Sequence, residues 1–130
     1  MPRRTKLRAG LRGLLGVLLI VQGANHFIAD AFMARMIPAY LPEPYLLVYL
    51  SGVAEIVLGA LLFVPRFRRM AGWGIIALLL AVFPANLQMA LHPEDWPDLP
   101  AAGLWARLPF QLLFLYWTWA VSLANDADPE

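Results

Sequence analysis

Four long runs of hydrophobic residues alternate with short polar segments along this chain. A helix needs about 20 mostly apolar residues to cross the hydrocarbon core of a bilayer, and each run is close to that length. The pattern therefore predicts an all-α fold in a single domain over residues 1–130, an integral membrane four-helix bundle. The four predicted spans cover about residues 11–28, 45–64, 70–91 and 104–123.

The segment between the first two spans has a different pattern. Its apolar residues recur at helical spacing until several prolines interrupt them, and proline breaks a helix interior. We predict a short interfacial helix on the outer surface, which either covers the mouth of the bundle or simply connects the two spans. The apolar residues are Phe32, Met33, Met36 and Ile37, and the prolines are Pro38, Pro42 and Pro44.

Composition supports a membrane protein, because 61% of the residues are hydrophobic and only 15% are charged. A soluble domain carries about 25% charged residues. The absence of cysteine excludes disulfide exchange, thiolate catalysis and iron–sulfur ligation by this chain. The sequence shows no phosphate-binding glycine loop, Ser–His–Asp set or basic nucleic-acid patch. We therefore expect no nucleic-acid partner and no independent catalytic activity, and we assign no catalytic residue.

The distribution of charge predicts the orientation. Lys and Arg gather in residues 3–12 and again in residues 66–69, two crossings later, while the other two loops are richer in Asp and Glu. Positive charges mark the cytoplasmic side, so both termini are expected there, in a multi-pass protein of a bacterial-type inner (plasma) membrane. A cleaved signal peptide is the competing interpretation of the basic start. The apolar run is long for one, and no clear small-residue cleavage site follows it.

Glu55 lies near the middle of the second predicted span. An ionisable side chain at that depth costs roughly 2.5–3.5 kcal/mol, so it normally faces a bundle interior or a wet cavity and has a partner. The other spans also carry polar side chains, several of them one helical turn apart on the same face. The candidates for ligand binding or proton handling are Gln22, Asn25, His26, Ser51, Glu55, Asn86, Arg107 and Gln111.

These candidates lie on one side of the membrane midplane. With a rise of about 1.5 Å per residue, Glu55 lies about 15 Å below the outer edge of its span, and the others lie at the midplane or in the outer half. The inner half has few polar side chains, chiefly Thr118 and Ser122. We therefore predict a cavity that opens to the outside, with Glu55 as its floor and Arg107 at its rim. Arg107 and His26 are the leading candidates for the partner of Glu55.

Each candidate also has a purely structural interpretation. Amide side chains such as Gln22 and Asn25 often only hydrogen-bond to a neighbouring helix, which contributes about 0.6 kcal/mol each. Arg107 is near enough to a helix end for its charge to reach the head groups. Glu55 could be protonated or ion-paired with no further role. A His26–Glu55 pair lacks a third converging ligand, so we predict no metal site.

An ordered set of short motifs resembles a known family. The motifs are Gly23-Ala-Asn-His26-Phe27, Ser51-Gly52-Val-Ala-Glu55, Phe83-Pro84-Ala85-Asn86 and Arg107-Leu-Pro109-Phe-Gln111. In these motifs the chain resembles the DoxX or DoxX-like family of small membrane proteins. The resemblance implies a four-helix membrane bundle. It implies more loosely a membrane or soluble redox partner, because the family takes its name from a subunit of a thiosulfate:quinone oxidoreductase.

Two functions are compatible with these residues. The first is a quinone- or small-ligand-binding accessory of a membrane redox system, with His26 and Glu55 contacting ligand oxygens or moving protons. The alternative is a non-enzymatic membrane chaperone or scaffold whose pocket holds a lipid or a client helix. The expected ligand is therefore a quinone or a lipid. The expected partners are the lipid bilayer, a redox protein and further copies of the chain in a homo-oligomer.

Overall fold

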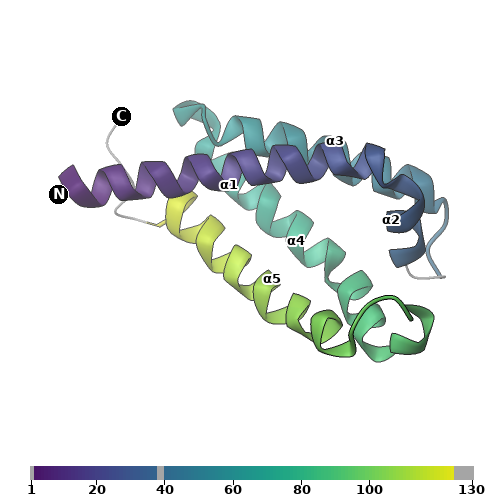
Figure 1. The fold of residues 1–130 in the computed structure, drawn as a ribbon. Helices are drawn as coiled ribbons and strands as arrows, with labels where there is room; N and C mark the ends of the chain where they lie inside the picture. Colours follow the sequence, from purple (N-terminus) through teal and green to yellow (C-terminus); the bar gives the residue numbers. More distant parts are fainter. Residues whose placement is uncertain (1, 38–39, 125–130) are drawn as a thin grey trace.

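The computed structural model describes residues 2–37 and 40–124, with side chains from Lys6 onward. These described residues form five α-helices and two short 3₁₀ helices (Figure 1), so the predicted all-α class is confirmed. The α-helices are α1 (Pro2–Ile28), α2 (Asp30–Met36), α3 (Pro44–Leu61), α4 (Arg68–Leu91) and α5 (Ala101–Ser122). The 3₁₀ helices are η1 (Pro65–Phe67) and η2 (Pro93–Asp95).

Prolines set several of the helix boundaries. Pro44 occupies the first turn of α3, and Pro65 begins η1, positions where a helix does not use the missing N–H group. Pro84 and Pro109 lie inside α4 and α5, where neighbouring helices can compensate for the lost hydrogen bond. The short helix α2 forms within the segment predicted to be interfacial. Pro38, which was expected to interrupt that helix, lies outside the described residues.

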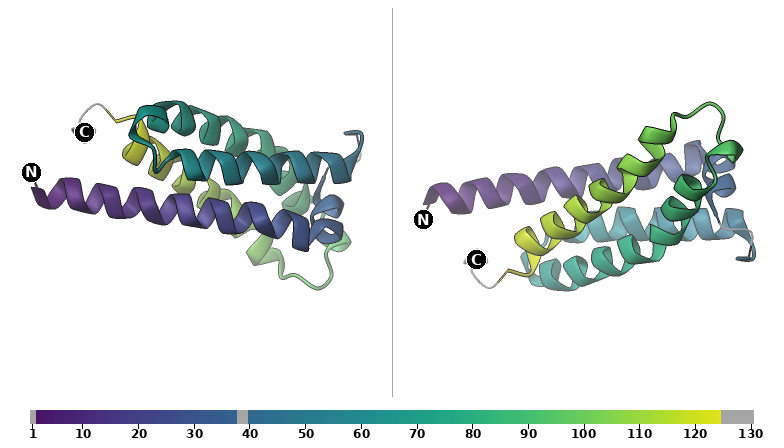
Figure 2. Two further views of the ribbon diagram at one scale, coloured as in Figure 1. Left: turned by 90° about the horizontal axis from the view of Figure 1, so that it is seen from above. Right: turned by 90° about the horizontal axis from the view of Figure 1, so that it is seen from below.

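The four long helices pack in a ring. α1 contacts α3, α3 contacts α4, α4 contacts α5, and α5 returns to α1. Figure 2 shows α1 and α3 side by side over most of their length. In contrast, α1 and α5 meet near the end where α1 begins and then diverge (Figure 1). The ring is therefore tightest between α1 and α3 and loosest between α1 and α5.

Glycines permit the close approach of α1 and α3. A Cβ atom on Gly23 would lie 2.6 Å from the backbone oxygen of Gly52, and one on Gly16 would lie 2.9 Å from that of Gly59. Real Cβ atoms do not approach backbone this closely, so a larger residue at either position would push the helices apart. The two glycine pairs thus hold the alignment that brings His26 of α1 against α3.

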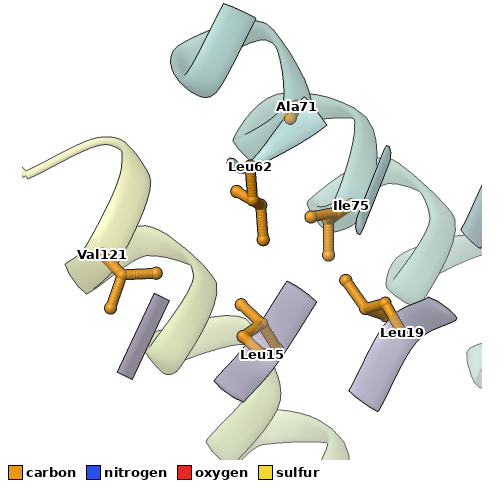
Figure 3. Close-up of a cluster of buried hydrophobic side chains, with 6 residues drawn as sticks. All are labelled: Leu15, Leu19, Leu62, Ala71, Ile75 and Val121. Carbon is orange, nitrogen blue, oxygen red and sulfur yellow. The ribbon is translucent and has the colours of Figure 1, made fainter. Parts of the chain in front are cut away.

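Two apolar clusters lie at opposite ends of α4 and α5. The first contains residues from α1, from the turn after α3, and from α4 and α5 (Figure 3): Leu15, Leu19, Leu62, Ala71, Ile75 and Val121. The second contains Met89, Ala90, Trp96 and Leu104. Residues 78–86 of α4 and 107–114 of α5 lie between these clusters, and this is the part of the bundle where polar side chains gather.

Two arginines hold the C-terminal end of α5. Nε of Arg12, a side chain that is only 5% exposed, donates a hydrogen bond to the Val121 carbonyl at 2.8 Å. Nη1 of Arg69 donates to the Leu123 carbonyl at 3.0 Å. The last carbonyls of a helix lack intrahelical partners and favour nearby cations. Both arginines therefore have a structural role in addition to the topological one that the sequence suggests.

Three helical segments are long and apolar enough to cross a membrane, namely Lys6–Ile28, Pro44–Leu61 and Pro65–Leu91. The fourth predicted span corresponds to α5, which has 22 residues but does not belong to this group. Arg107 and Gln111 lower its hydropathy, and its several Trp and Tyr residues add little to it. Length and composition therefore support three of the four membrane crossings that the sequence predicts.

Candidate functional site

A cavity of about 680 Å³ lies between the helices. All five α-helices contribute to its lining, and the apolar residues Leu79, Val82 and Phe114 form part of its walls. The polar residues of the lining are the eight candidates predicted from the sequence: Gln22, Asn25, His26, Ser51, Glu55, Asn86, Arg107 and Gln111. The fold thus brings polar residues from four separate helices into one space.

His26 and Glu55 form a short polar contact on the α1–α3 wall. Nε2 of His26 lies 2.8 Å from Oε2 of Glu55, and the two side chains are only 12% and 14% exposed. The other ring nitrogen, Nδ1, lies 2.9 Å from the Val48 carbonyl oxygen and 3.1 Å from Oγ of Ser51. Glu55 is therefore paired with His26 and not with Arg107. Which of these two residues meets Glu55 depends on how the helices are rotated about their axes.

The surrounding hydrogen bonds limit the protonation states of this pair. The Val48 carbonyl can only accept, so Nδ1 of His26 carries a hydrogen. Ser51 also donates to that carbonyl, at 3.0 Å, which leaves its Oγ lone pairs facing Nδ1. Two bare lone pairs would repel at 2.8 Å, so one further proton lies on Nε2 of His26 or on Oε2 of Glu55, although the geometry of this contact is not that of a hydrogen bond. The pair is therefore neutral overall, whether His26 or Glu55 holds that proton.

A second polar network connects α4 and α5 across the cavity lining. Nε of Arg107 donates to Oδ1 of Asn86 at 3.2 Å, and Nδ2 of Asn86 donates to Oε1 of Gln111 at 2.9 Å. Gln111 in turn donates from Nε2 to the Leu79 carbonyl. Because that carbonyl can only accept, both amides have one consistent orientation along this chain of hydrogen bonds.

The charge of Arg107 is not neutralised by a carboxylate in the described part of the chain. Its interactions there are confined to the hydrogen bond with Asn86. The side chain is half-buried and lines the cavity. Its two terminal NH₂ groups are thus available to a ligand.

Gln22 and Asn25 line the cavity without hydrogen-bond partners among the described residues. Gln22 is exposed and Asn25 is half-buried. Of the three polar residues that share one face of α1, only His26 makes a polar contact with another helix. Gln22 and Asn25 are therefore available to a ligand but are not part of either network.

The short helix α2 covers one end of the cavity. Its residues Phe32, Met33 and Met36 belong to the lining, as does Ile37 just after it. Asp30 accepts a hydrogen bond of 2.6 Å from the Tyr49 hydroxyl, which attaches α2 to α3. The sequence predicts this short helix. A cover over the mouth of the bundle is one of the two roles predicted for it, and a simple connector is the other.

Arg35 attaches α2 to the loop that precedes α5. Its guanidinium lies 4.6 Å from the centroid of the Trp96 ring, and Nη2 donates to the Asp95 carbonyl at 3.3 Å. A smaller cavity of about 260 Å³ lies beside this contact, with His92 and Gln88 in its lining. No pattern in the sequence indicates this attachment, because it joins residues 60 positions apart.

The loop between α4 and α5 also contains three exposed groups that could hold a metal ion, from His92, Glu94 and Asp95. One ligand atom from each lies within 4.8 Å of the others. Exposed acidic side chains commonly gather without an ion, and none of the three is buried. The main cavity contains one histidine and one carboxylate, which is too few protein ligands for a closed zinc site.

Fold and cavity define the class of this protein: an all-α chain with three helices apolar enough to cross a membrane and a pocket of mixed polarity. Within that class the chain belongs to the family described as "Domain of unknown function (DUF8561)", whose model matches residues 15–122. Comparison with curated proteins and with solved structures found no match.

The assignment to the DoxX family that the sequence motifs suggest is therefore wrong, because the family model that matches is a different one. The motifs behind it consist of small residues and single polar residues within apolar helices. Here Gly23 and Gly52 permit close packing, and His26 and Glu55 lie within ion-pair distance of each other. Such requirements recur wherever apolar helices pack closely, so short motifs of this kind do not identify a family. The redox partner implied by the resemblance loses its support.

Proposed function

We propose that this chain is a four-helix integral membrane protein whose cavity binds a small ligand dissolved in the bilayer, a quinone or a lipid-like molecule. The chain would act as a binding protein without independent catalytic activity. The observation that carries this proposal is the cavity lining, in which apolar walls surround two polar networks. Its volume of about 680 Å³ is in the range of ligand pockets, roughly 300–1,000 Å³.

A fourth membrane crossing is supported by the surface of α5. Its 22 residues reach about 33 Å at about 1.5 Å per residue, enough for a hydrocarbon core about 30 Å thick. Arg107 and Gln111 line the cavity, so their polarity is turned away from lipid. The exposed side chains further along α5 are apolar or aromatic, namely Leu112, Leu113, Tyr116 and Trp119.

Charge supports an outward-facing cavity in a bacterial-type inner (plasma) membrane. Arg12 and Arg69 lie at the end where α1 begins, whereas Asp30 and Glu94 lie at the opposite end of the long helices. The positive-inside rule then places both termini in the cytoplasm. Along α4 the cavity residues come after Ala71 and Ile75 of the first apolar cluster, which lies near the cytoplasmic end in this orientation. The cavity therefore lies toward the outside.

Exposed cavity-lining residues on α1 and α5 support entry of the ligand from the bilayer between these two helices. At the inner end the two helices are joined by Arg12 and by Trp117, whose Nε1 donates to the Leu11 carbonyl at 3.0 Å. Beyond these contacts they diverge (Figure 1). Val21 of α1 and Phe110 of α5, both exposed, line the cavity there. A bilayer-dissolved ligand would meet an apolar entrance.

The ligand can be identified by mass spectrometry of what the protein retains. The full chain is purified in a mild detergent, and bound lipids and quinones are extracted and quantified. We expect one compound near one equivalent per chain. Val82→Trp, which places an indole in the cavity lining, should reduce its occupancy by about tenfold, because ligand and side chain compete for the same volume.

Leu80→Trp is the matched control, because Leu80 is on the same helix but 57% exposed. It should leave occupancy unchanged. Equal loss in both variants, or lipid retained equally by all three proteins, would contradict specific binding in the cavity. A co-purifying polypeptide that Val82→Trp displaces would instead favour the alternative, a chaperone or scaffold that holds a client helix.

A further inference from the structure

We propose that Arg107 is the head-group site of this cavity and that the ligand is an anionic amphiphile: a singly charged carboxylate or phosphate group on an apolar tail. The inference rests on the proposed ligand-binding function and narrows its ligand class. It depends on three features of the cavity, which are its net charge, the orientation of the Arg107 guanidinium, and the apolar residues of α1 and α5 in its lining.

The lining of the cavity has an uncompensated positive charge. His26, Glu55 and Arg107 are its ionisable residues. Nε2 of His26 and Oε2 of Glu55 lie 2.8 Å apart, which requires a proton on one of the two atoms, so the pair carries no net charge. Arg107 has a single hydrogen bond, to the neutral amide of Asn86, among the described residues. An isolated charge is costly in a medium of low dielectric constant, and a ligand with one negative charge would offset that cost.

The hydrogen-bond network holds the Arg107 side chain in the cavity. The chain of donors from Arg107 through Asn86 and Gln111 ends on the Leu79 carbonyl, which fixes the direction of every bond in it. Arg107 uses only Nε in this network. Both terminal NH₂ groups keep the forked arrangement that binds carboxylate or phosphate oxygens in pairs. Asn86 and Gln111 are therefore positioning residues for the guanidinium.

Extension of Arg107 toward the lipid head groups is the competing explanation for its position. The hydrogen bond to Asn86 of α4 argues against it, because that bond draws the guanidinium toward the neighbouring helix. The half-buried position of the side chain agrees with this direction. A guanidinium that reached the lipid head groups would be solvated there and would not depend on the hydrogen-bonded amides of Asn86 and Gln111 for its position.

The apolar part of the lining favours an amphiphile over a free inorganic anion. Leu18 and Val21 of α1 and Phe110 and Phe114 of α5 line the cavity. Leu18, Val21 and Phe110 are exposed, so an alkyl chain would bury apolar surface along them and continue into the bilayer. The head group would then lie at Arg107 while the tail leaves between α1 and α5.

The test compares two ligands that differ only in the head group. Binding of labelled sodium oleate and of oleyl alcohol, which share one hydrocarbon tail, is measured with the full chain in detergent. Oleate should bind at least about tenfold more tightly, the value expected for a hydrogen-bonded charge pair. Arg107→Gln should abolish that preference, and Arg107→Lys should retain part of it. Arg66→Gln, an exposed charge at the other end of the molecule, should leave it unchanged.

Dioleoylphosphatidylglycerol in place of oleate tests the phosphate source of the same chemistry. Tight binding of this lipid but not of oleate, lost in Arg107→Gln, assigns the site to a phosphate head group. Equal affinity for oleate and oleyl alcohol, with no effect of Arg107→Gln on any ligand, overturns the anionic site while leaving the cavity function intact. If no amphiphile binds to the folded wild-type chain, the ligand-binding function fails as well.

Discussion

The pairing of His26 with Glu55 shows what residue types and spacing can and cannot predict. The sequence identifies Glu55 as a costly residue that needs a partner, and it identifies His26 and Arg107 as the candidates. The choice between them depends on the rotation of α1 and α5 about their axes, which spacing does not determine. The structure selects His26, because the glycine pairs bring α1 against α3 and because Val48 and Ser51 orient the imidazole.

Substitutions at this pair should show strong coupling. His26→Leu leaves a buried carboxyl group without its partner, and Glu55→Leu leaves Nε2 of His26 without its partner, so each should destabilise the fold by about 1–3 kcal/mol. The double variant removes both polar groups and should lose clearly less than the sum of the two single variants. Unfolding by denaturing detergent, followed by circular dichroism, measures all three.

Glu55→Gln is the control for this series, because an amide can still hydrogen-bond to Nε2 of His26. It should be closer in stability to the wild type than Glu55→Leu is. Additive losses in the His26→Leu and Glu55→Leu double variant would show that the 2.8 Å contact does not contribute as a pair.

At the scale of elements, hydrophobic runs predict the apolar parts of helices better than their ends. The first span was expected from about residue 11, yet α1 begins at Pro2. Arg and Lys are good helix formers, so the helix continues beyond its apolar part. The fourth span, predicted over about residues 104–123, corresponds to α5 (Ala101–Ser122), whose polar residues line the cavity and which is not among the helices apolar enough to cross a membrane. Which face a helix turns toward its neighbours cannot be read from composition.

The glycine contacts between α1 and α3 lead to a prediction at this scale. Gly23→Ala places a Cβ atom 2.6 Å from the Gly52 oxygen, so it should destabilise the fold by about 1–3 kcal/mol through the forced separation of the helices. Gly10→Ala lies on the same helix with nothing within 4 Å of its Cβ. It should be neutral or stabilise by up to about 1 kcal/mol, because alanine favours a helix. Equal effects of both substitutions, measured by the same detergent unfolding, would exclude tight packing there.

At the scale of the whole molecule, the ring of four long helices is uneven. The α1–α3 side is closed by glycine contacts, and on the α1–α5 side hydrogen bonds from Arg12 and Trp117 hold the two helices together near the end where α1 begins. This difference produces a cavity whose polar residues come from four helices and whose proposed entrance lies between α1 and α5. The sequence predicts the polar residues and their depth, but not this entrance, because it depends on the angle between α1 and α5.

The proposed orientation can be tested with single cysteines, since the chain has none of its own. Arg66→Cys and Asp98→Cys each introduce an exposed thiol, in the loops before α4 and before α5. In intact cells an impermeant thiol reagent should label Asp98→Cys at once and Arg66→Cys only after the membrane is permeabilised. Labelling of both from outside, or the reverse pattern, would contradict the assignment of an outward-facing cavity.

The most direct measurement of ligand binding in the cavity is nuclear magnetic resonance of the chain in nanodiscs of deuterated lipid, with protonated oleate added. Val82 and Val21 line the cavity, whereas Leu50 and Leu80 are exposed and are not part of its lining. Magnetisation transfer from the oleate tail should reach the methyl groups of Val82 and Val21 and be absent at Leu50 and Leu80. Equal transfer to all four residues would mean that oleate only dissolves in the bilayer around the protein, and the cavity would then not be its binding site.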